Sequence, residues 1–340
     1  MREKNTTISI EYARWKFIKH STENYKNNIP VDLQYEVSNI LERWLLSGIS
    51  YFMKKNKVID ASGFHSFNQK AISELMEKNV PIEFIGDLNN IENSKRNTFV
   101  DIIRQINQFV TKPVKIVKGK CIIGETYIEY KDFKVCISQE KSKLFKRYNS
   151  RDVVKCALRY GILMSRGQQW SIPQKQYDYL YNNYSVRYEG FASPFNSKLI
   201  GKRDAKFCSL FKDTDKVFGS MGSFFDVELN KNQAWAINPP FIESIMINTS
   251  KKILKMLKSR YDVFVFYILP AWNDSSSIQM IKRSKYLKHI KVLRKNTYFY
   301  ESEILRKKIK AKFNSVLFIL SNRKFNGDLN KLTENMMMIY

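Results

Sequence analysis

Four consecutive residues, Asn238, Pro239, Pro240 and Phe241, have types and spacing suited to chemistry on an aromatic amine. The lone pair of such an amine is delocalised into the ring, so the nitrogen is a poor nucleophile. A site helps when it accepts hydrogen bonds from both N–H groups as the nitrogen becomes tetrahedral. The side-chain oxygen of Asn238 is one acceptor and the Pro239 carbonyl is a second. The prolines stiffen the turn because each fixes φ near about −65°.

Phe241 completes this motif with a flat face on which adenine can stack, a contact worth roughly 1–3 kcal/mol. Catalysis there would consist mostly of holding the nitrogen, the methyl group and a sulfonium in line. The structural alternative is an ordinary helix start, with Asn238 as the N-cap and Pro239 in the first turn. That alternative gives no reason for the second proline or for the aromatic ring.

The segments around the motif alternate between strand-like and helical patterns. A short strand, AWAI, ends before Asn238, and apolar residues recur at helical spacing from Ile242 to Leu257. DVFVFYIL at 262–269 is almost continuously apolar, which is typical of a strand covered on both faces. Further strands are expected near 289–294 and at 315–320. This alternation predicts a doubly wound α/β domain, in which ligands bind at the carboxyl ends of the strands.

The N-terminal half has a different character. The first 110 residues are expected to be mainly helical, and Asp152 is expected to cap a later helix. The predicted organisation is a mainly helical N-terminal region over 1–150 with a β-meander near 114–138, a helical segment over 151–185 packing on the catalytic domain, an α/β domain over 186–322, and a C-terminal tail over 323–340.

Lysine and arginine number 58 against 32 aspartates and glutamates, so the net charge is +26. This surplus suits a polyanion, nucleic acid before a membrane surface, although an AT-rich coding sequence would also enrich Lys, Asn and Ile. The sequence has neither a run of about eighteen apolar residues nor a secretory signal, and no membrane partner is expected. We expect a protein inside the cell, in nucleus or cytoplasm; a viral source would suit this composition.

The residues that commonly bind metals are few and scattered. The four cysteines have spacings that fit neither a zinc site nor a dense disulfide framework. The three histidines lie far apart in the sequence, which argues against a histidine-based metal site and against Ser-His-Asp chemistry. We expect no metal.

Several short motifs follow one another between residues 150 and 322. They are GQQW at 167–170, FASPFN at 191–196, FCSLFKDTDKVFGSMGSFFD at 207–226, INPPF at 237–241, VFYILPAW at 265–272 and NSVLFILSN at 314–322. In this combination the sequence resembles the cap-specific adenosine-N6 methyltransferase family, also called the phosphorylated-CTD-interacting-factor family. NPPF alone is shared with many amino-methyltransferases, whereas FASP-N, FGS-G and P-W are far more specific.

The resemblance implies a class I, Rossmann-like methyltransferase domain joined to a helical domain. It implies methyl transfer from S-adenosylmethionine, without a metal, to N6 of the 2′-O-methyladenosine next to the 7-methylguanosine cap of an RNA. The motif Asn238 to Phe241 would take the catalytic and adenine-binding roles. The residues that would bind the cofactor are Phe191, Ala192, Ser193, Pro194, Asn196, Phe218, Gly219, Ser220 and Asp226.

Cellular members of this family begin with a WW domain that binds the polymerase tail. No such module is visible here, because Trp15 and Trp44 lie in helix-like surroundings. We therefore expect no recruitment to the polymerase tail through a WW domain.

A capped RNA needs an aromatic and basic surface. The cationic 7-methylguanine base binds well between aromatic faces, which makes Trp170 and Trp272 candidates, although a place in the core explains either tryptophan equally well. Tyr298 and Tyr300 are expected in a loop, where they would touch cap or substrate. The candidates for holding phosphates are Arg159, Arg166 and the basic run 306–312.

Two other hypotheses stay open at this point. The same chemistry could act on DNA or on an internal RNA adenine, because NPPF recognises only the amine and the ring. The chain could also be an inactive RNA-binding subunit on a methyltransferase fold, an alternative that the intact NPPF motif disfavours.

Overall fold

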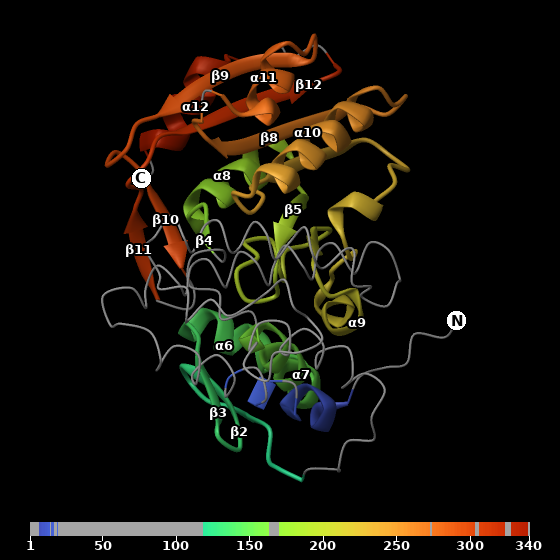
Figure 1. Cartoon of the computed structure of the whole chain (residues 1–340), viewed down its shortest axis with the longest axis vertical. Coiled ribbons are helices and arrows are strands. Elements are labelled where there is room, and N and C mark those ends of the chain that lie inside the picture. The colour runs from blue at the N-terminus through green and yellow to red at the C-terminus, as the bar shows by residue number, and fades with distance from the viewer. Residues whose placement is uncertain are drawn as a thin grey trace, which may run out of the picture. The chain divides into compact units, whose positions relative to one another are not determined.

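The computed structural model describes residues 7–13, 15–16, 19, 118–162, 170–272, 274–302, 306–323 and 328–338. Two compact units make up the chain (Figure 1). Unit 1 comprises Met1–Ile122, Ile128–Val135 and Ser150–Ser165, and unit 2 comprises Ile123–Tyr127, Cys136–Asn149 and Arg166–Tyr340. Most of the predicted N-terminal helical region lies outside the described residues, apart from helical residues between 8 and 19.

Three short strands form a sheet in the order β1-β2-β3, within the segment 114–138 where a β-meander was expected. They are β1 (Ile122–Ile123), β2 (Tyr127–Tyr130) and β3 (Phe133–Cys136). Helix α7 (Ser150–Ile162) begins two residues before Asp152, so this residue is not the cap but lies in the first turn, 2.8 Å from Lys155. Because α7 belongs to unit 1 and strand β4 (Trp170–Ser171) follows it, residues 151–185 do not form one helical segment.

Unit 2 is a mixed α/β structure built on a six-stranded sheet in the order β6-β5-β7-β8-β12-β9. The first four of these strands are parallel, and β12 runs antiparallel to both β8 and β9. The strands are β5 (Tyr188–Ala192), β6 (Lys206–Ser209), β7 (Gln233–Ile237), β8 (Val263–Pro270), β9 (Leu287–Leu293) and β12 (Ser315–Ser321). The predicted strands before Asn238 and at 262–269, 289–294 and 315–320 are therefore confirmed.

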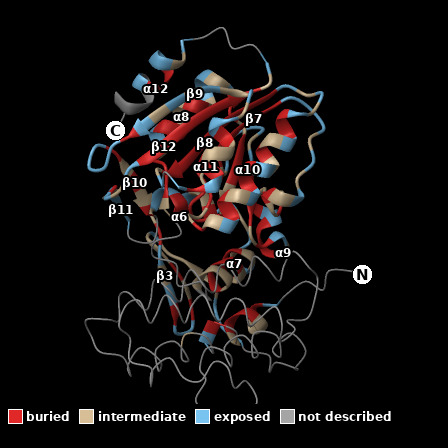
Figure 2. Ribbon diagram, turned by 45° about the horizontal axis from the view of Figure 1, so that its top comes forward, coloured by how far each residue is buried: buried red, intermediate tan, exposed pale blue. Residues whose placement is uncertain are grey.

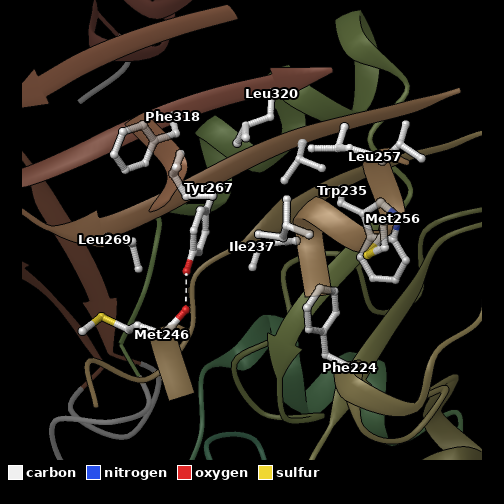
Figure 3. Packing of buried hydrophobic residues seen from close by; sticks show 14 of the residues in the cluster. Phe224, Trp235, Ile237, Met246, Met256, Leu257, Tyr267, Leu269, Phe318 and Leu320 are labelled. Atoms are coloured by element: carbon white, nitrogen blue, oxygen red, sulfur yellow. Dashed lines mark hydrogen bonds between the residues drawn. The ribbon is translucent and has the colours of Figure 1, made fainter. Parts of the chain in front are cut away.

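Strand β8 is apolar along its whole length, which fits a sheet whose two faces are both covered by helices. All eight residues of the strand are buried, and alternate side chains enter different clusters. Tyr267 faces one cluster, where its hydroxyl donates to the Met246 carbonyl at 3.2 Å (Figure 3), while Phe266 faces the other. Because successive side chains of a strand point to opposite faces, a continuous apolar sequence fits a sheet between two layers of helices.

The helices of unit 2 supply those layers, with exposed outer faces and a buried sheet between them (Figure 2). Helix α10 and helix α11 contribute to one core cluster, α8 and α12 to the other. The helices are α6 (Gln139–Phe145), α8 (Gln174–Tyr184), α9 (Lys212–Asp215), α10 (Glu243–Leu257), α11 (Ser276–Lys282) and α12 (Leu329–Met338), with 3-10 turns η1 (Lys216–Phe218) and η2 (Phe224–Asp226). Residues 323–340 are therefore not simply a tail, because Leu332 of α12 is fully buried.

A second sheet of unit 2 has three strands in the order β11-β10-β4. Strand β10 (Phe299–Ser302) pairs antiparallel with β11 (Lys307–Lys310), and its other edge pairs Ser302 with Trp170 of β4. Among the described residues, no helix is long and apolar enough to cross a membrane.

Candidate active site

The sequence motifs meet where the direction of the chain through the large sheet reverses. From β5 the chain moves outward to β6, and it then returns to β7 on the other side of β5. The carboxyl ends of β5 and β7 thus flank the switch point, where ligands bind in open α/β sheets. FASPFN leaves β5 at this edge and NPPF leaves β7 beside it. The parallel pairing of β5 with β7 places FASPFN (191–196) and NPPF (238–241) at neighbouring strand ends.

Asn238 directly follows the last residue of β7, and one hydrogen bond orients its side-chain amide. Its side-chain nitrogen Nδ2 donates to the main-chain carbonyl of Trp170 at 3.4 Å. Its oxygen Oδ1 is buried and has no hydrogen-bond partner in the described part of the chain. An unsatisfied buried acceptor costs about 1–3 kcal/mol, so such an atom requires a partner, which a substrate group or a water molecule can supply.

The structural alternative for NPPF does not hold. The N-cap of α10 is Ile242, four residues after Asn238, and it makes no side-chain capping bond. The amide of Ile242 instead donates to the Pro240 carbonyl at 2.8 Å. Within the described residues no hydrogen bond ends on the carbonyl of Pro239. The two acceptors expected from the sequence, Asn238 Oδ1 and the Pro239 carbonyl, therefore accept no hydrogen bond from the described residues.

Phe241 packs its ring edge-on against other aromatic rings next to the motif. Its centroid lies 6.3 Å from Tyr300 and 5.7 Å from Phe313. The ring of Trp170 lies 6.2 Å from Tyr300 in a nearly parallel arrangement. These side chains belong to one core cluster that joins the small sheet to the NPPF turn.

Tyr298 and Tyr300 are part of this cluster and not of an exposed loop. Tyr300 lies in β10, and the two residues are only 1% and 2% exposed. The Tyr298 hydroxyl donates to Ser315 Oγ at 2.7 Å, and the Tyr300 hydroxyl lies 3.1 Å from the same atom. The prediction of a loop position was wrong for Tyr300, because alternation in β10 turns this ring inward. Neither ring offers a free face to a cap.

The loop after β5 is folded by its own side chains. Asn196 Oδ1 accepts from both the backbone nitrogen of Ser193, at 2.6 Å, and its hydroxyl, at 2.9 Å. Ser193, Pro194 and Asn196 are buried, whereas Phe191 and Ala192 are half-buried at the strand end. Phe191 contacts Phe224 at 5.2 Å between ring centroids. The first three residues thus shape the loop, and the last two stand nearer to its open side.

Two buried charged residues hold this loop and were missed from the sequence. Lys141 of α6 donates from Nζ to the carbonyl of Ser197 at 2.7 Å and to that of Pro194 at 3.3 Å. Glu189 of β5 accepts from Ser197 Oγ at 2.7 Å and from the Lys198 amide at 3.0 Å. Burial raises the pKa of the Glu189 carboxyl, against the opposing effect of these bonds and of the Lys141 charge. Only tertiary structure brings Lys141 to the loop.

The FGS-G segment runs along the outer edge of β6. Ser220 forms a parallel bridge with Phe207, and its Oγ lies 2.6 Å from Ser209 Oγ. Gly219 has φ +97°, which favours glycine. Apart from its chain neighbours, no atom of the described residues lies within 4 Å of where a side chain would begin. Phe218 is buried against Tyr148, with ring centroids 4.9 Å apart, so it belongs to the core.

Asp226 lies in η2 and its side chain is exposed. The carbonyls of the residues before and after it bind a lysine. Lys252 of α10 donates to the carbonyls of Phe225 and Val227 at 3.1 and 2.5 Å. Burial lowers the pKa of Lys252, and the nearby charge of Asp226 opposes this shift. The carboxylate of Asp226 is therefore placed by α10 and stays open to solvent.

Trp272 lies just beyond β8, whose parallel pairing with β7 puts it at the same edge as NPPF. Its side chain is 43% exposed, an unusual position for so large an apolar ring. The segment after it is tied to the first turn of α10, because Ser275 Oγ lies 3.0 Å from the Glu243 carboxylate. Trp272 is thus a surface residue at the edge of the sheet where the NPPF turn also lies.

The two arginines predicted to hold phosphates have different outcomes. Arg159 of α7 lies in unit 1 and makes a two-point ion pair with Glu11, at 2.7 Å from Nε and 2.6 Å from the terminal nitrogen. Glu11 is fully buried, so the Arg159 charge already serves a partner inside the protein. Arg166 lies outside the described residues.

Among the residues that the structure describes, no group of three His, Cys, Asp or Glu side chains is placed to hold a metal ion. All four cysteines are free thiols.

Comparison with known proteins agrees with these motifs. A family model described as "Phosphorylated CTD interacting factor 1 WW domain" matches residues 130–303, just over half of the chain. The match runs from the β-meander to just past β10. It includes strands β5 to β9 of the large sheet and ends before β12, so it bears on this domain. The expected lack of a separate WW module stays a prediction.

Two curated relatives carry the same name, mRNA (2'-O-methyladenosine-N(6)-)-methyltransferase. The protein of Mus musculus is 29% identical over 171 residues and that of Homo sapiens is 28% identical over 171 residues. Each match covers 48% of this chain but only 23% of the relative, so the chain matches less than a quarter of their length. The family match and the ordered motifs around β5 and β7 lead to one conclusion: this chain belongs to the phosphorylated-CTD-interacting-factor family.

Proposed function

We propose that this protein methylates N6 of the 2′-O-methyladenosine next to the 7-methylguanosine cap of an RNA, with S-adenosylmethionine as the methyl donor. One observation carries the proposal: the buried and unpartnered Oδ1 of Asn238 at the carboxyl end of β7, inside an NPPF turn. The name of the two relatives refers to the same atom and nucleoside and supports the proposal.

The fold that fits this activity is the class I, Rossmann-like methyltransferase domain. Four parallel strands with a switch point between β5 and β7 support it, as do helices on both faces of the sheet. On the side away from β6, the antiparallel strand β12 lies between β8 and β9, and β9 forms the edge of the sheet.

The cofactor would lie where the loops after β5 and β6 approach each other. Phe191 and Ala192 at the strand end would line its pocket, and Ser193, Pro194 and Asn196 would hold the loop in shape. Gly219 leaves open space beside its backbone, and the exposed Asp226 is the acidic group suited to ribose hydroxyls. S-adenosylmethionine supplies an electrophilic methyl group on a sulfonium centre.

The chain's part in the reaction is to hold the amine. Asn238 Oδ1 accepts one N–H of the adenine amine and the Pro239 carbonyl accepts the other, which favours the tetrahedral nitrogen. Phe241 supports the base by stacking. An amide accepts a hydrogen bond without taking the proton, so the proton released by methyl transfer leaves to solvent.

The RNA would follow an exposed basic strand next to the site. Lys307, Lys308 and Lys310 of β11, called here the β11 lysines, are all exposed. They belong to the small sheet that carries Trp170. Trp272 supplies the exposed ring on which a cationic cap base would stack.

The test is methyl transfer to four matched oligonucleotides, with N6-methyladenine measured by mass spectrometry. One RNA carries a cap followed by 2′-O-methyladenosine, one a cap followed by guanosine, and one has no cap; the fourth is single-stranded DNA. We expect transfer to the first alone. Transfer to uncapped RNA or DNA would reject the cap while keeping the NPPF chemistry. Absence of both transfer and cofactor binding would indicate an inactive RNA-binding subunit.

Asn238→Ala tests the residue that carries the proposal. We expect a loss on the order of 10²–10³ in rate, as for removal of one preorganised polar group elsewhere, with the fold unchanged. Asn248→Ala is the matched control, because Asn248 is an exposed asparagine on α10. Near-normal turnover by Asn238→Ala would exclude the proposed role.

A further inference from the structure

Two buried polar atoms next to the NPPF turn lack hydrogen-bond partners among the described residues, and they belong to residues in direct contact. One is Oδ1 of Asn238, an acceptor; the other is Nε1 of Trp170, a donor. The Asn238 amide nitrogen bonds to the carbonyl of Trp170 itself, so the two residues form one unit. The role given above to Asn238 uses only the acceptor, and the Trp170 donor is left without a function.

We infer that Trp170 and Asn238 recognise the edge of adenine together. Asn238 Oδ1 accepts from the N6 amine, and Trp170 Nε1 donates to one of the ring nitrogens beside that amine, N1 or N7. This inference rests on the proposed function and deepens it, because it makes Trp170 a residue that determines base specificity.

The chemistry of the two atoms matches adenine and opposes guanine. Adenine presents an amine donor flanked on each side by a ring nitrogen that accepts. An indole nitrogen only donates, and the bond to Trp170 turns the Asn238 amide so that its oxygen is the free atom. Guanine would place its O6 acceptor against Asn238 Oδ1. A site with buried polar groups rejects a base that leaves them unpaired more strongly than an apolar pocket could.

The Trp170 ring is held firmly enough to act in this way. Its centroid lies 6.2 Å from the ring of Tyr300, with 29° between the planes. The backbone of Trp170 pairs with Ser302 of β10, and the Tyr300 hydroxyl lies 3.1 Å from Ser315 Oγ of β12. The small sheet thereby fixes the indole to the large sheet that carries Asn238.

This placement changes the role expected of Trp170 from the sequence, which was to stack on the cap. Its ring is half-buried and already stacked, whereas Trp272 is exposed. Both unpartnered atoms have almost no solvent-accessible surface, so the base reaches them only when neighbouring side chains move.

The test combines one protein change with changes to single substrate atoms. Capped RNAs carry adenosine, 1-deazaadenosine or 7-deazaadenosine at the first position, and kcat/KM is measured for the wild type and for Trp170→Phe, which keeps a ring and removes the donor. We expect the wild type to lose roughly ten-fold or more on the one analogue that lacks the contacted nitrogen, about what one hydrogen bond is worth. Trp170→Phe should lose as much on adenosine, and nothing further on that analogue.

The same substitution at Trp235 is the matched control. Its Nε1 already donates to Gln233 at 3.0 Å inside the core, so Trp235→Phe should lower stability but keep the wild-type ratios between substrates. Each variant is checked by thermal unfolding.

The outcomes separate this inference from the proposed function. No transfer by the wild type to capped adenosine RNA would reject the function. Wild-type activity that is equal on all three nucleosides would overturn the inference alone, even if Trp170→Phe failed to fold. An equal loss by Trp170→Phe on all three substrates would likewise overturn it, because a merely structural role would not depend on the ring nitrogen.

Discussion

The buried ammonium of Lys141 should be necessary for the loop that follows β5. Lys141→Met keeps most of the side-chain length and removes the charge. The Ser197 carbonyl then loses a bond of 2.7 Å and the Pro194 carbonyl one of 3.3 Å. Glu189 also loses the positive charge that opposes the effect of its burial.

The expected cost follows from these two bonds. A hydrogen bond to a charged group contributes about 1.5–3 kcal/mol, and the longer bond contributes less than the shorter one. Removing the buried ammonium recovers part of its desolvation cost, which reduces the sum. We therefore expect unit 2 to lose about 2 kcal/mol of unfolding free energy, equivalent to a shift of roughly 1 M in the urea midpoint. S-adenosylmethionine should also bind more weakly, because the loop would line its site.

Urea unfolding followed by circular dichroism measures the first effect, and calorimetric titration with S-adenosylmethionine measures the second. Lys143→Met is the control, since Lys143 lies two residues away on the same helix and is exposed. A wild-type urea midpoint together with normal cofactor binding in Lys141→Met would contradict the role given to its ammonium group. An equal change in Lys143→Met would contradict it as well.

Three further outcomes are expected. Arg159→Met should destabilise unit 1 by about 3–5 kcal/mol, because it leaves Glu11 buried without its counter-charge, and should leave the salt dependence of RNA binding unchanged in filter binding. Replacing the β11 lysines by glutamine should weaken RNA binding and reduce the slope of log affinity against log salt by about 1 for each phosphate that a lysine no longer neutralises. The Tyr12 hydroxyl donates to Asp132, and burial is the main cause that raises its pKa from 10.0 to about 12. The stability from this proton is complete below pH 10.0 and lost as pH rises through about 12, so the advantage of wild type over Tyr12→Phe in unfolding experiments should disappear across that range.

The sequence predicted the parts of the fold that depend on long apolar patterns. β8 and β12 lie inside the sheet, and their uninterrupted apolar residues distinguish them without any knowledge of their partners. β6 and β10 are only four residues long, and β10 alternates in burial although its residues, Phe-Tyr-Glu-Ser, do not alternate between apolar and polar. Such strands form because a neighbouring strand supplies their hydrogen bonds, and the local sequence does not predict which strand that is.

The same limit separates the candidate site residues that were placed well from those that were not. NPPF and FASPFN could be located because each follows a recognisable strand. Tyr300 was expected on the surface because nothing in its own segment indicates that β10 packs against Phe313. Arg159 was expected to meet phosphate because a sequence does not show that a carboxylate 148 residues earlier is its partner.

The orientation of Asn238 depends on the same kind of distant contact. The motif supplies an amide at the end of β7, but an amide can present either its oxygen or its nitrogen to a substrate, with opposite consequences for an amine. The Trp170 carbonyl, 68 residues earlier in the chain, takes the nitrogen and leaves the oxygen for the substrate. That carbonyl is placed by β4, which pairs with β10. NPPF therefore provides the residue types, and the small sheet determines which atom of Asn238 faces the base.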